Sequence, residues 1–261
     1  MPKLLAIIPL WAFIVVEMRA TTIVVVRTPV DVSIAAGILG TFLGPEGPEN
    51  GRSVCKIYQL GDVFLGATGL DNDPATCFSV SQIVSEAIRA KPAFIEKMSA
   101  ATSALMPKLL SEANTLRQTR PAAFAALGNQ PNGGVAIILV GTEDGIPVAV
   151  GQRFGVSVDA GGTTRVSPEE LQCCPGADCP HGVYTFVLGK REAIDEYHTV
   201  RRTIVDSADL ARRLVQREVE AHAEGVGGPI DALRITARQQ QWIREKPGCP
   251  IAQWPPNRTR K

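Results

Sequence analysis

The sequence lacks an excess of charge of either sign. Its 261 residues include 27 lysines and arginines against 26 aspartates and glutamates, for a formal net charge of +1. Nucleic acids and anionic membranes attract proteins through basic surfaces, so a balanced chain provides no electrostatic argument for either partner. We therefore expect no nucleic-acid partner.

Beyond its first residues, the chain also lacks an apolar run long enough to cross a membrane. The longest comparable run, Val135–Val140, has six residues, whereas a spanning helix needs about 20. At the N-terminus, Lys3 precedes a 13-residue apolar stretch, Leu4–Val16, and a short polar segment then closes on Ala20. This pattern is typical of a cleavable export signal, although an uncleaved anchor is the alternative. We expect cleavage after Ala20 to release an exported chain, periplasmic or extracellular, that starts at Thr21 and has no membrane segment.

Motifs that define several common enzyme classes are missing as well. The sequence has no G-x-S-x-G elbow, no phosphate-binding P-loop and no dinucleotide fingerprint. Its three histidines, His181, His198 and His222, have no serine nucleophile beside them in any known pattern. We therefore expect no organic cofactor and no serine-type triad.

Six cysteines are present, at positions 55, 77, 173, 174, 179 and 249. An even number in an exported chain indicates disulfides, and six cysteines allow 15 pairings that the sequence cannot distinguish. Cys55 with Cys77 is one guess, and one residue of the 173–174 pair with Cys179 or Cys249 is another. A zinc site including His181 is the alternative, but its spacing fits no common finger, so we expect no metal.

Hydrophobic periodicity predicts one α+β domain over residues 21–245, with an irregular tail at 246–261. We expect strands at 21–27, 30–36, 55–60, 63–67, 135–140, 147–151, 183–188 and 230–236, and helices at 80–88, 94–117 and 208–223. Ser79 caps the first helix, Asp206 or Ser207 caps the last, and Pro107 should kink or divide the middle one. Residues 44–51 are too rich in glycine and proline for regular structure. This order favours helices packed on antiparallel sheets.

Thr21 becomes chemically interesting once it is the first residue of a chain. An N-terminal threonine contains a nucleophile and a base together, because its hydroxyl attacks while its free α-amine removes the proton. The amine suits this role because its ordinary pKa is about 7.7 to 8. Removal of the export signal would then also activate the site.

Four segments in order resemble the start of proteasome β-type subunits, which belong to the N-terminal nucleophile hydrolase superfamily. They are Thr21-Thr-Ile-Val-Val-Val, Val32-Ser-Ile-Ala-Ala, Cys55-Lys-Ile-Tyr-Gln-Leu-Gly-Asp62 and Gly66-Ala-Thr-Gly69. Glu224-Gly-Val-Gly-Gly-Pro-Ile-Asp231 is similar to the glycine-rich segment near the family's C-terminus. The resemblance implies a four-layer αββα sandwich, in which two antiparallel sheets are covered by helices on both outer faces.

The resemblance also implies roles for three residues. Thr21 matches the family nucleophile, and Lys56 matches the buried lysine that lowers the pKa of the threonine and amine pair by disfavouring further positive charge. Gly69 matches the glycine whose backbone N–H holds the oxyanion of the tetrahedral intermediate.

Three positions depart from the family pattern. Gly37 stands where active subunits have the carboxylate that pairs with the lysine, so we expect Lys56 to lack that partner. Ala223 and Val226 replace an aspartate and a serine that support the N-terminal amine, and Glu224 is one residue away from the aspartate position. These departures weaken the predicted site.

Together these features predict an exported threonine-type amidohydrolase or peptidase that acts on a peptide or small amide. We expect no ATP-driven partner outside the cell, and any assembly should be a homo-oligomer. The alternative, favoured by Gly37, Ala223 and Val226, is an inactive protein that keeps the fold as a scaffold or binding module.

Overall fold

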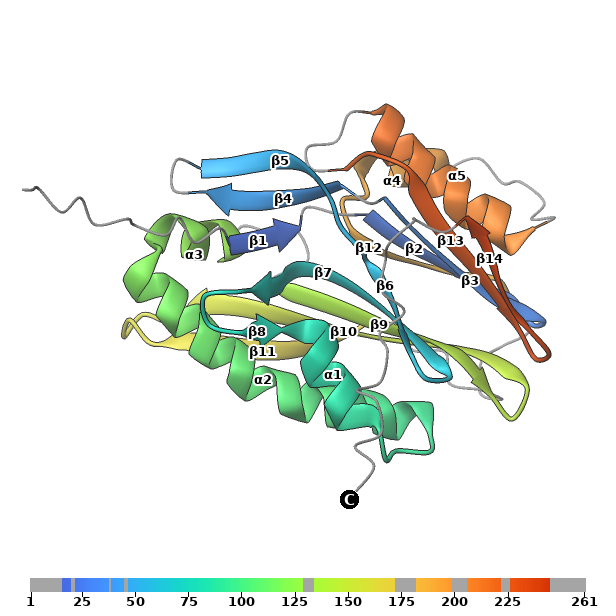
Figure 1. Ribbon diagram of the computed structural model, residues 1–261, viewed down its shortest axis with the longest axis horizontal. Helices are drawn as coiled ribbons and strands as arrows, with labels where there is room; N and C mark the ends of the chain where they lie inside the picture. Colours follow the sequence, from blue (N-terminus) through green and yellow to red (C-terminus); the bar gives the residue numbers. More distant parts are fainter. Residues whose placement is uncertain are drawn as a thin grey trace, which may run out of the picture.

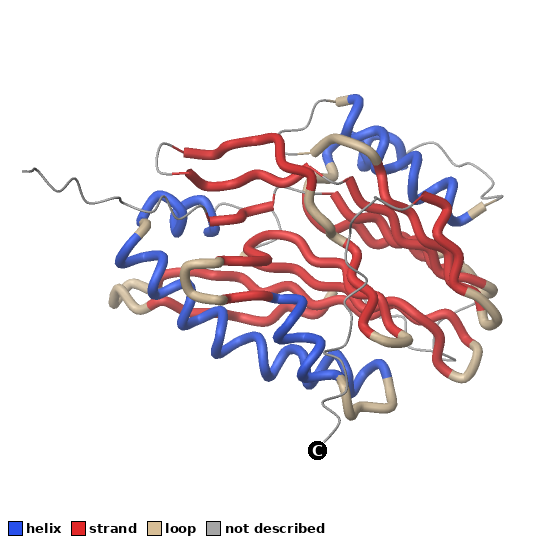
Figure 2. Tube along the Cα trace, viewed as in Figure 1, coloured by secondary structure: helices blue, strands red, loops and turns tan. Residues whose placement is uncertain are grey.

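The computed structural model describes residues 16–19, 22–37, 39–44, 47–128, 134–171, 182–198, 206–221 and 226–244. Two antiparallel sheets face each other, and helices cover the outer face of each, which makes four layers (Figure 1). Figure 2 shows the strands gathered between the two groups of helices. The predicted αββα sandwich is therefore confirmed.

The large sheet has nine strands in the described part of the chain. Its main path runs β11-β10-β9-β7-β1-β4-β5, and β6 and β8 also pair with β7. The strands are β1 (Val16–Arg19), β4 (Leu39–Gly44), β5 (Gly47–Ser53), β6 (Ile57–Leu60), β7 (Val63–Asp73), β8 (Phe78–Ser79), β9 (Val135–Glu143), β10 (Ile146–Val158) and β11 (Thr164–Glu170). Because β7 pairs with β1, β6, β8 and β9, it is the central connection of this sheet.

The small sheet has the strand order β12-β2-β3-β13-β14. Its strands are β2 (Thr22–Arg27), β3 (Asp31–Gly37), β12 (Tyr184–Gly189), β13 (Ile230–Thr236) and β14 (Gln240–Arg244). Every residue of β2 and β3 is buried. Both strands are central and covered on both faces, which explains why their sequences are nearly continuous runs of valine, isoleucine and alanine.

The two sheets meet in a core built by alternating residues of facing strands. Ile23, Ile34, Phe64, Ile138 and Leu233 belong to this inter-sheet core. The Phe64 ring also meets the Trp242 ring edge to face, with 6.2 Å between the ring centroids. Since strand side chains alternate between faces, the neighbours of these residues point outward toward the helices.

Three helices cover the outer face of the large sheet: α1 (Val80–Ile88), α2 (Phe94–Thr119) and α3 (Pro121–Gly128). Ser79 caps α1 as predicted, with its hydroxyl accepting the N–H of Gln82 at 3.4 Å. Pro107 does not divide α2, which is one helix of 26 residues. Pro107 and Ser103 lie on its exposed side, so the carbonyl that loses its N–H partner can bind water, while Leu105 and Leu109 pack below.

Two helices cover the outer face of the small sheet: α4 (Glu192–His198) and α5 (Ser207–Glu220). Asp206 caps α5 by accepting the N–H of Asp209 at 2.9 Å. Glu218, which is buried, accepts the N–H of Ile194 at 3.1 Å and so joins the helices. Burial raises the pKa of Glu218, and this hydrogen bond opposes the rise.

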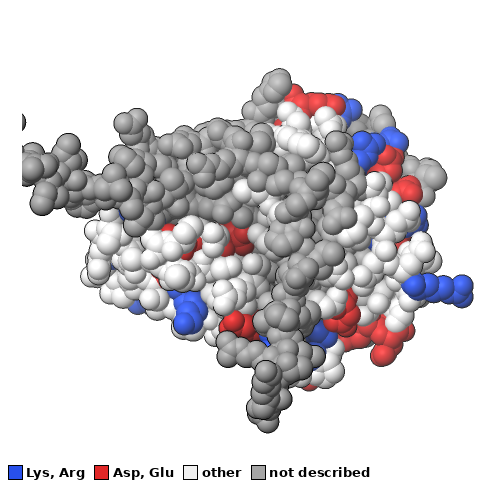
Figure 3. All heavy atoms as spheres, viewed as in Figure 1, with Lys and Arg blue, Asp and Glu red and all other residues white. Residues whose placement is uncertain are grey.

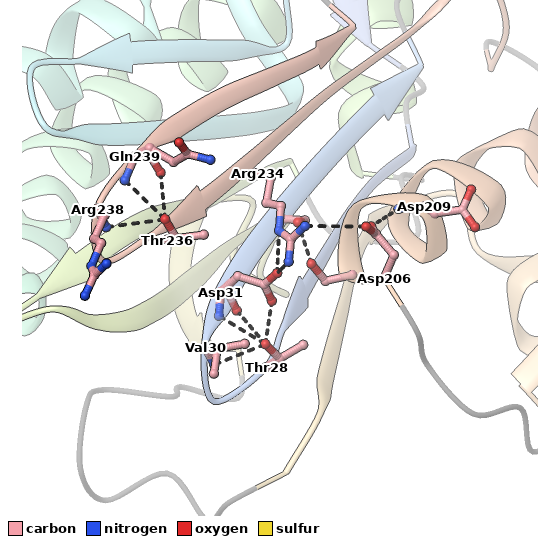
Figure 4. A network of polar contacts seen from close by, with 11 residues as sticks. Thr28, Val30, Asp31, Asp206, Asp209, Arg234, Thr236, Arg238 and Gln239 are labelled. Atoms are coloured by element: carbon pink, nitrogen blue, oxygen red, sulfur yellow. Dashed lines mark hydrogen bonds and ion pairs between the residues drawn. The ribbon is translucent and has the colours of Figure 1, made fainter.

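A polar network fixes the start of α5 against the small sheet (Figure 4). Arg234 on β13 donates to Asp31 at the start of β3 at 2.6 Å and lies 3.5 Å from Asp206. Asp31 also accepts the hydroxyl of Thr28 from the turn before it. The buried Asp31 carboxylate therefore joins a turn and two strands, and Arg234 extends this network to the start of α5.

The described part of the chain contains no helix that is both long and apolar enough to span a membrane. On the face shown in Figure 3, acidic and basic side chains lie interspersed among uncharged ones.

Two sequence predictions are wrong. Residues 44–51, predicted as a loop, largely belong to a hairpin: β4 ends at Gly44 and β5 begins at Gly47. Pairing with β1 extends the sheet over β4, and local composition cannot report such a long-range contact. The guessed Cys55–Cys77 disulfide is also wrong, because Cys77 is free and exposed while Cys55 is bonded to another cysteine. The tail at 246–261 lies outside the described residues.

Candidate active site

The predicted nucleophile, Thr21, lies outside the described residues, directly before the start of β2. Thr22 is completely buried, and its hydroxyl donates to the carbonyl of Lys190 at 2.9 Å. Ile23 pairs with Ala36 near the end of β3. The chain therefore enters the small sheet at a fixed register, beside Gly37.

The strand before this entry point belongs to the other sheet. Arg19 of β1 pairs with Gly69 of β7, and Met18 pairs with Leu70. Only residues 20 and 21 separate β1 from β2, and the three Cα–Cα steps from Arg19 to Thr22 span at most about 11 Å. Gly69 is therefore paired with a residue that precedes Thr21 by two positions in the sequence. The cleavage itself stays a prediction, and β1 belongs to the uncleaved chain.

Gly69 is held in a conformation that favours glycine. Its φ of +84° lies in the left-handed region, and a Cβ added there would lie 2.3 Å from the carbonyl oxygen of Gly134. That oxygen also accepts the N–H of Leu70 at 3.0 Å. Any side chain at position 69 would collide with backbone rather than with a movable group. The peptide unit at Gly69 is thus rigid, which is the property an oxyanion-binding N–H requires.

Lys56 is completely buried and lies directly before β6. Its carbonyl accepts the N–H of Ala67 on β7 at 3.4 Å. The next residue, Ile57, pairs with Gly66, and a Cβ on Gly66 would lie 3.3 Å from the Ile23 side chain. The structure thus brings the segment with Lys56, the strand with Gly69 and the start of β2 to one region between the sheets.

Gly37 faces the opposite layer. A Cβ built there would contact Val215 on α5 and Val226, each at 3.6 Å. A carboxylate at this position would thus begin among apolar side chains on the helix side of β3. Lys56 nevertheless has an interaction partner in the structure, so glycine at position 37 does not leave it isolated.

The other two departures from the family pattern lie near this apolar contact. Val226 is buried, with 7% of its surface exposed, and the carbonyl of the next residue, Gly227, would lie 3.5 Å from a Cβ at Gly37. Ala223 and the nearby Glu224 lie outside the described residues. On this side, the described part of the candidate site is packed by apolar groups.

Sequence reasoning missed three polar residues near the candidate site. The Tyr58 hydroxyl lies 2.6 Å from an oxygen of Asp71, whose side chain is 2% exposed. Asp231 is buried on β13 opposite Ala36, a residue of the inter-sheet core. For Asp231 a signal was available in the sequence, because this aspartate interrupts a strand between Ile230 and Ala232.

A metal site finds no support among the described side chains. Within this part of the chain, no group of three or more histidine, cysteine, aspartate or glutamate residues is placed to hold an ion. The four residues of the zinc alternative, Cys173, Cys174, Cys179 and His181, lie outside it.

No known family model matches the chain, and no curated protein is similar to it. Among solved structures, it is similar to eukaryotic HslV from Trypanosoma brucei, with a TM-score of 0.46 and 18% identity over 82% of this chain and 99% of that one. It is also similar to Thiobacillus denitrificans BPH in complex with epoxomicin, with a TM-score of 0.43 and 16% identity over 83% and 98%. At these values, neither likeness assigns a family or an activity.

Proposed function

We propose that this chain, once freed of residues 1–20, is an exported threonine-type amidohydrolase that cleaves a peptide or small amide. Thr21 would supply the nucleophile and, through its α-amine, the base. Lys56 would adjust the acidity of that pair, and Gly69 would stabilise the oxyanion. The chemistry requires neither a metal nor an organic cofactor.

One observation carries the proposal: Arg19 pairs with Gly69 two residues before Thr21. This register supports the proposal, because Gly69 pairs with a residue only two positions before Thr21 in the sequence. Lys56 reaches the same strand, because its carbonyl accepts the N–H of Ala67. Two residues chosen from sequence alone are thus attached to one strand, beside the start of β2.

The proposed reaction has two steps. The Thr21 Oγ1 attacks the carbonyl carbon of the substrate while its α-amine takes the hydroxyl proton. The resulting oxyanion is bound by the N–H of Gly69, and collapse of the intermediate transfers the proton to the leaving amine. Water then attacks the ester formed on Thr21 while the α-amine takes a proton from it, and this proton passes to the departing Thr21 Oγ1 as the acid product is released. The ammonium form of Lys56 would lower the pKa of the α-amine by repulsion and so favour its neutral form.

Release of residues 1–20 would also create space for a substrate. β1 lies between β7 and β4 and is paired with both in antiparallel register. Its departure would expose unpaired backbone groups on each of these strands. An extended peptide can pair with such edges through its own backbone, which suits a peptide substrate.

The alternative function is an inactive scaffold or binding module. The apolar surroundings of Gly37, formed by Val215 and Val226, favour it, because active family members are expected to have polar groups at these positions. The two functions differ in whether Thr21 reacts.

The first prediction tests this difference on secreted protein. Edman sequencing should give Thr21 as the first residue. Thr21→Ala should lower hydrolysis of a panel of peptide amides by at least about 1,000-fold, since the nucleophile is lost. Labelling by a threonine-directed epoxyketone, measured by intact mass, should disappear in the same variant.

Thr163→Ala is the matched control, because Thr163 is exposed and lies in the turn between β10 and β11. It should keep full activity and labelling. A mature N-terminus other than Thr21, or equal activity in wild type and Thr21→Ala, would rule out the enzyme and leave the scaffold.

A further inference from the structure

The segment that carries Lys56 belongs to no strand. β5 ends at Ser53 and β6 begins at Ile57, yet the Lys56 side chain between them is completely buried. Its backbone link to β7, from the Ala67 N–H to the Lys56 carbonyl, is long at 3.4 Å. The position of this buried lysine therefore depends on contacts outside the sheet ladders.

Tyr58 supplies one such contact. Its hydroxyl lies 2.8 Å from the carbonyl oxygen of Cys55 and 2.6 Å from a carboxylate oxygen of Asp71. Cys55 immediately precedes Lys56, and Asp71 lies on β7 two residues after Gly69. The single proton of the Tyr58 hydroxyl is shared between these two acceptors, so the hydroxyl lies between the backbone that leads into Lys56 and the strand that holds Gly69.

The disulfide at Cys55 is a second anchor, since it fixes the residue just before Lys56 covalently. Both contacts hold Cys55: Tyr58 through a hydrogen bond to its carbonyl, and the disulfide through a covalent bond. Together they restrain the one irregular stretch between β5 and β6.

Stability alone does not favour this arrangement. Asp71 is 2% exposed, and taking a carboxylate out of water costs free energy that an apolar residue of similar size would not incur. A hydrogen bond between a hydroxyl and a buried carboxylate is, however, short and directional, so it suits the fixing of a position. The effect of a charge on a neighbouring amine falls with distance, so the position of Lys56 determines its influence.

We propose that Tyr58 and Asp71 are positioning residues that hold Lys56 in register with Gly69. The structural part of this inference concerns where Lys56 lies. Its catalytic part rests on the proposed function, because it assumes that Lys56 influences the Thr21 amine.

The second prediction concerns the reactivity of Lys56 in Tyr58→Phe, which removes only the bridging hydroxyl. The native protein is treated with an acetylating succinimidyl ester, and acetylation of each lysine is quantified by peptide mass spectrometry. Loss of the Tyr58 hydroxyl should expose Lys56 and raise its acetylation rate by at least about 5-fold relative to that of Lys97. Lys97 is a buried lysine on α2, and its acetylation reports global opening of the fold. Asp71→Asn should act in the same direction.

Tyr184→Phe is the matched control, because it removes the hydroxyl of a partly buried tyrosine on β12. It should leave the ratio of Lys56 to Lys97 acetylation unchanged. An unchanged ratio in Tyr58→Phe, or a Lys56 rate that rises only in parallel with Lys97, would overturn the positioning role.

Peptide-amide hydrolysis tests the catalytic part separately. Tyr58→Phe should lower kcat by about 10-fold with KM within about twofold, and should shift the acidic limb of the pH profile, because a displaced ammonium influences the amine less. If Lys56 acetylation rises while kcat and the pH profile stay the same, the catalytic part is wrong. An inactive wild type would overturn the proposed function, and acetylation would still decide the position of Lys56.

Discussion

The two sides of the candidate site differ in chemistry. The β7 side, comprising residues 55–58 and 69–73, contains the buried Lys56, a Tyr58–Asp71 hydrogen bond and a glycine that backbone contacts constrain. The β3 side, comprising Gly37 with Val215 and Val226, is apolar. Each side packs against different helices, β7 against α1 and β3 against α5.

This difference teaches that departures from a family pattern can be confined to one side of a site. On the β7 side, glycine at position 69 is enforced by a steric collision. On the β3 side, a Cβ at position 37 would make only ordinary contacts, so glycine there is not a steric requirement. We therefore expect a substitution of Gly69 by alanine to destabilise the fold strongly and the same substitution of Gly37 to have little effect.

The largest effect should come from Gly69→Ala. The left-handed φ and the 2.3 Å approach to the Gly134 oxygen should destabilise the fold by at least about 3 kcal/mol, measured as the free energy of unfolding in urea. Gly128→Ala is the control, because the nearest atom to its added Cβ is 3.8 Å away. Similar stability of the two variants would contradict the steric constraint on the β7 side.

A smaller loss should follow from Gly37→Asp. This change puts a carboxylate among Val215 and Val226, and its desolvation should cost about 2 kcal/mol in the same urea measurement. Gly37→Ala should stay within about 1 kcal/mol of wild type, because position 37 does not need a positive φ. If Gly37→Asp left the free energy of unfolding unchanged and increased hydrolysis, the β3 side would accommodate a carboxylate, and its apolar character would not limit activity.

The third effect depends on pH and concerns the far end of β7, where Asp73, Glu112 and Arg120 meet. Arg120 donates to both oxygens of Asp73 but lies 3.8 Å from Glu112. Its positive charge therefore stabilises the ionised form of Asp73 more than that of Glu112. Burial raises the pKa of Glu112 to about 7, and its hydrogen bond with Asp73 adds to the rise. Burial would also raise the pKa of Asp73, but the hydrogen bonds from Arg120 and Glu112 lower it below its usual value.

The free energy of unfolding should depend on pH, because the folded protein favours the protonated form of Glu112. Because its folded pKa exceeds the ordinary 4.5, its contribution to stability is complete below pH 4.5 and is lost as pH rises through about 7. Asp73 stays ionised over that window. The free energy of unfolding should fall by up to about 3 kcal/mol between pH 4.5 and 8, and Glu112→Gln should abolish this part of the slope. An identical slope in Glu112→Gln would show that Glu112 is not the titrating group.

Much of the fold could be predicted from the sequence because its signals are local. The valine and isoleucine runs of β2 and β9, the serine that caps α1 and the aspartate that caps α5 were all readable from neighbouring residues. The β4–β5 hairpin was not, since it depends on pairing with β1, which is distant along the chain from β5. Pro107 does not divide α2, because packing of the helix on the sheet outweighs the local effect of the proline.

The candidate site divides in the same way. Lys56 and Gly69 were found through a resemblance in sequence order, and the structure brings their segments together. Tyr58, Asp71 and Asp231 were not found, because a polar residue within an apolar strand does not show which strand lies opposite. Thr21 as nucleophile and the export of the chain stay predictions.

By itself, the sequence determined which residues could form strands, which face of each helix is apolar and where the glycines and charges lie. These properties depend on side-chain chemistry and on spacing along one segment. Only the tertiary structure decided that Gly69 must be glycine, that Gly37 faces α5 and that Tyr58 links Lys56 to β7. Each of these facts is a contact between different elements of the fold, and such contacts form only when strands have paired and helices have packed on them.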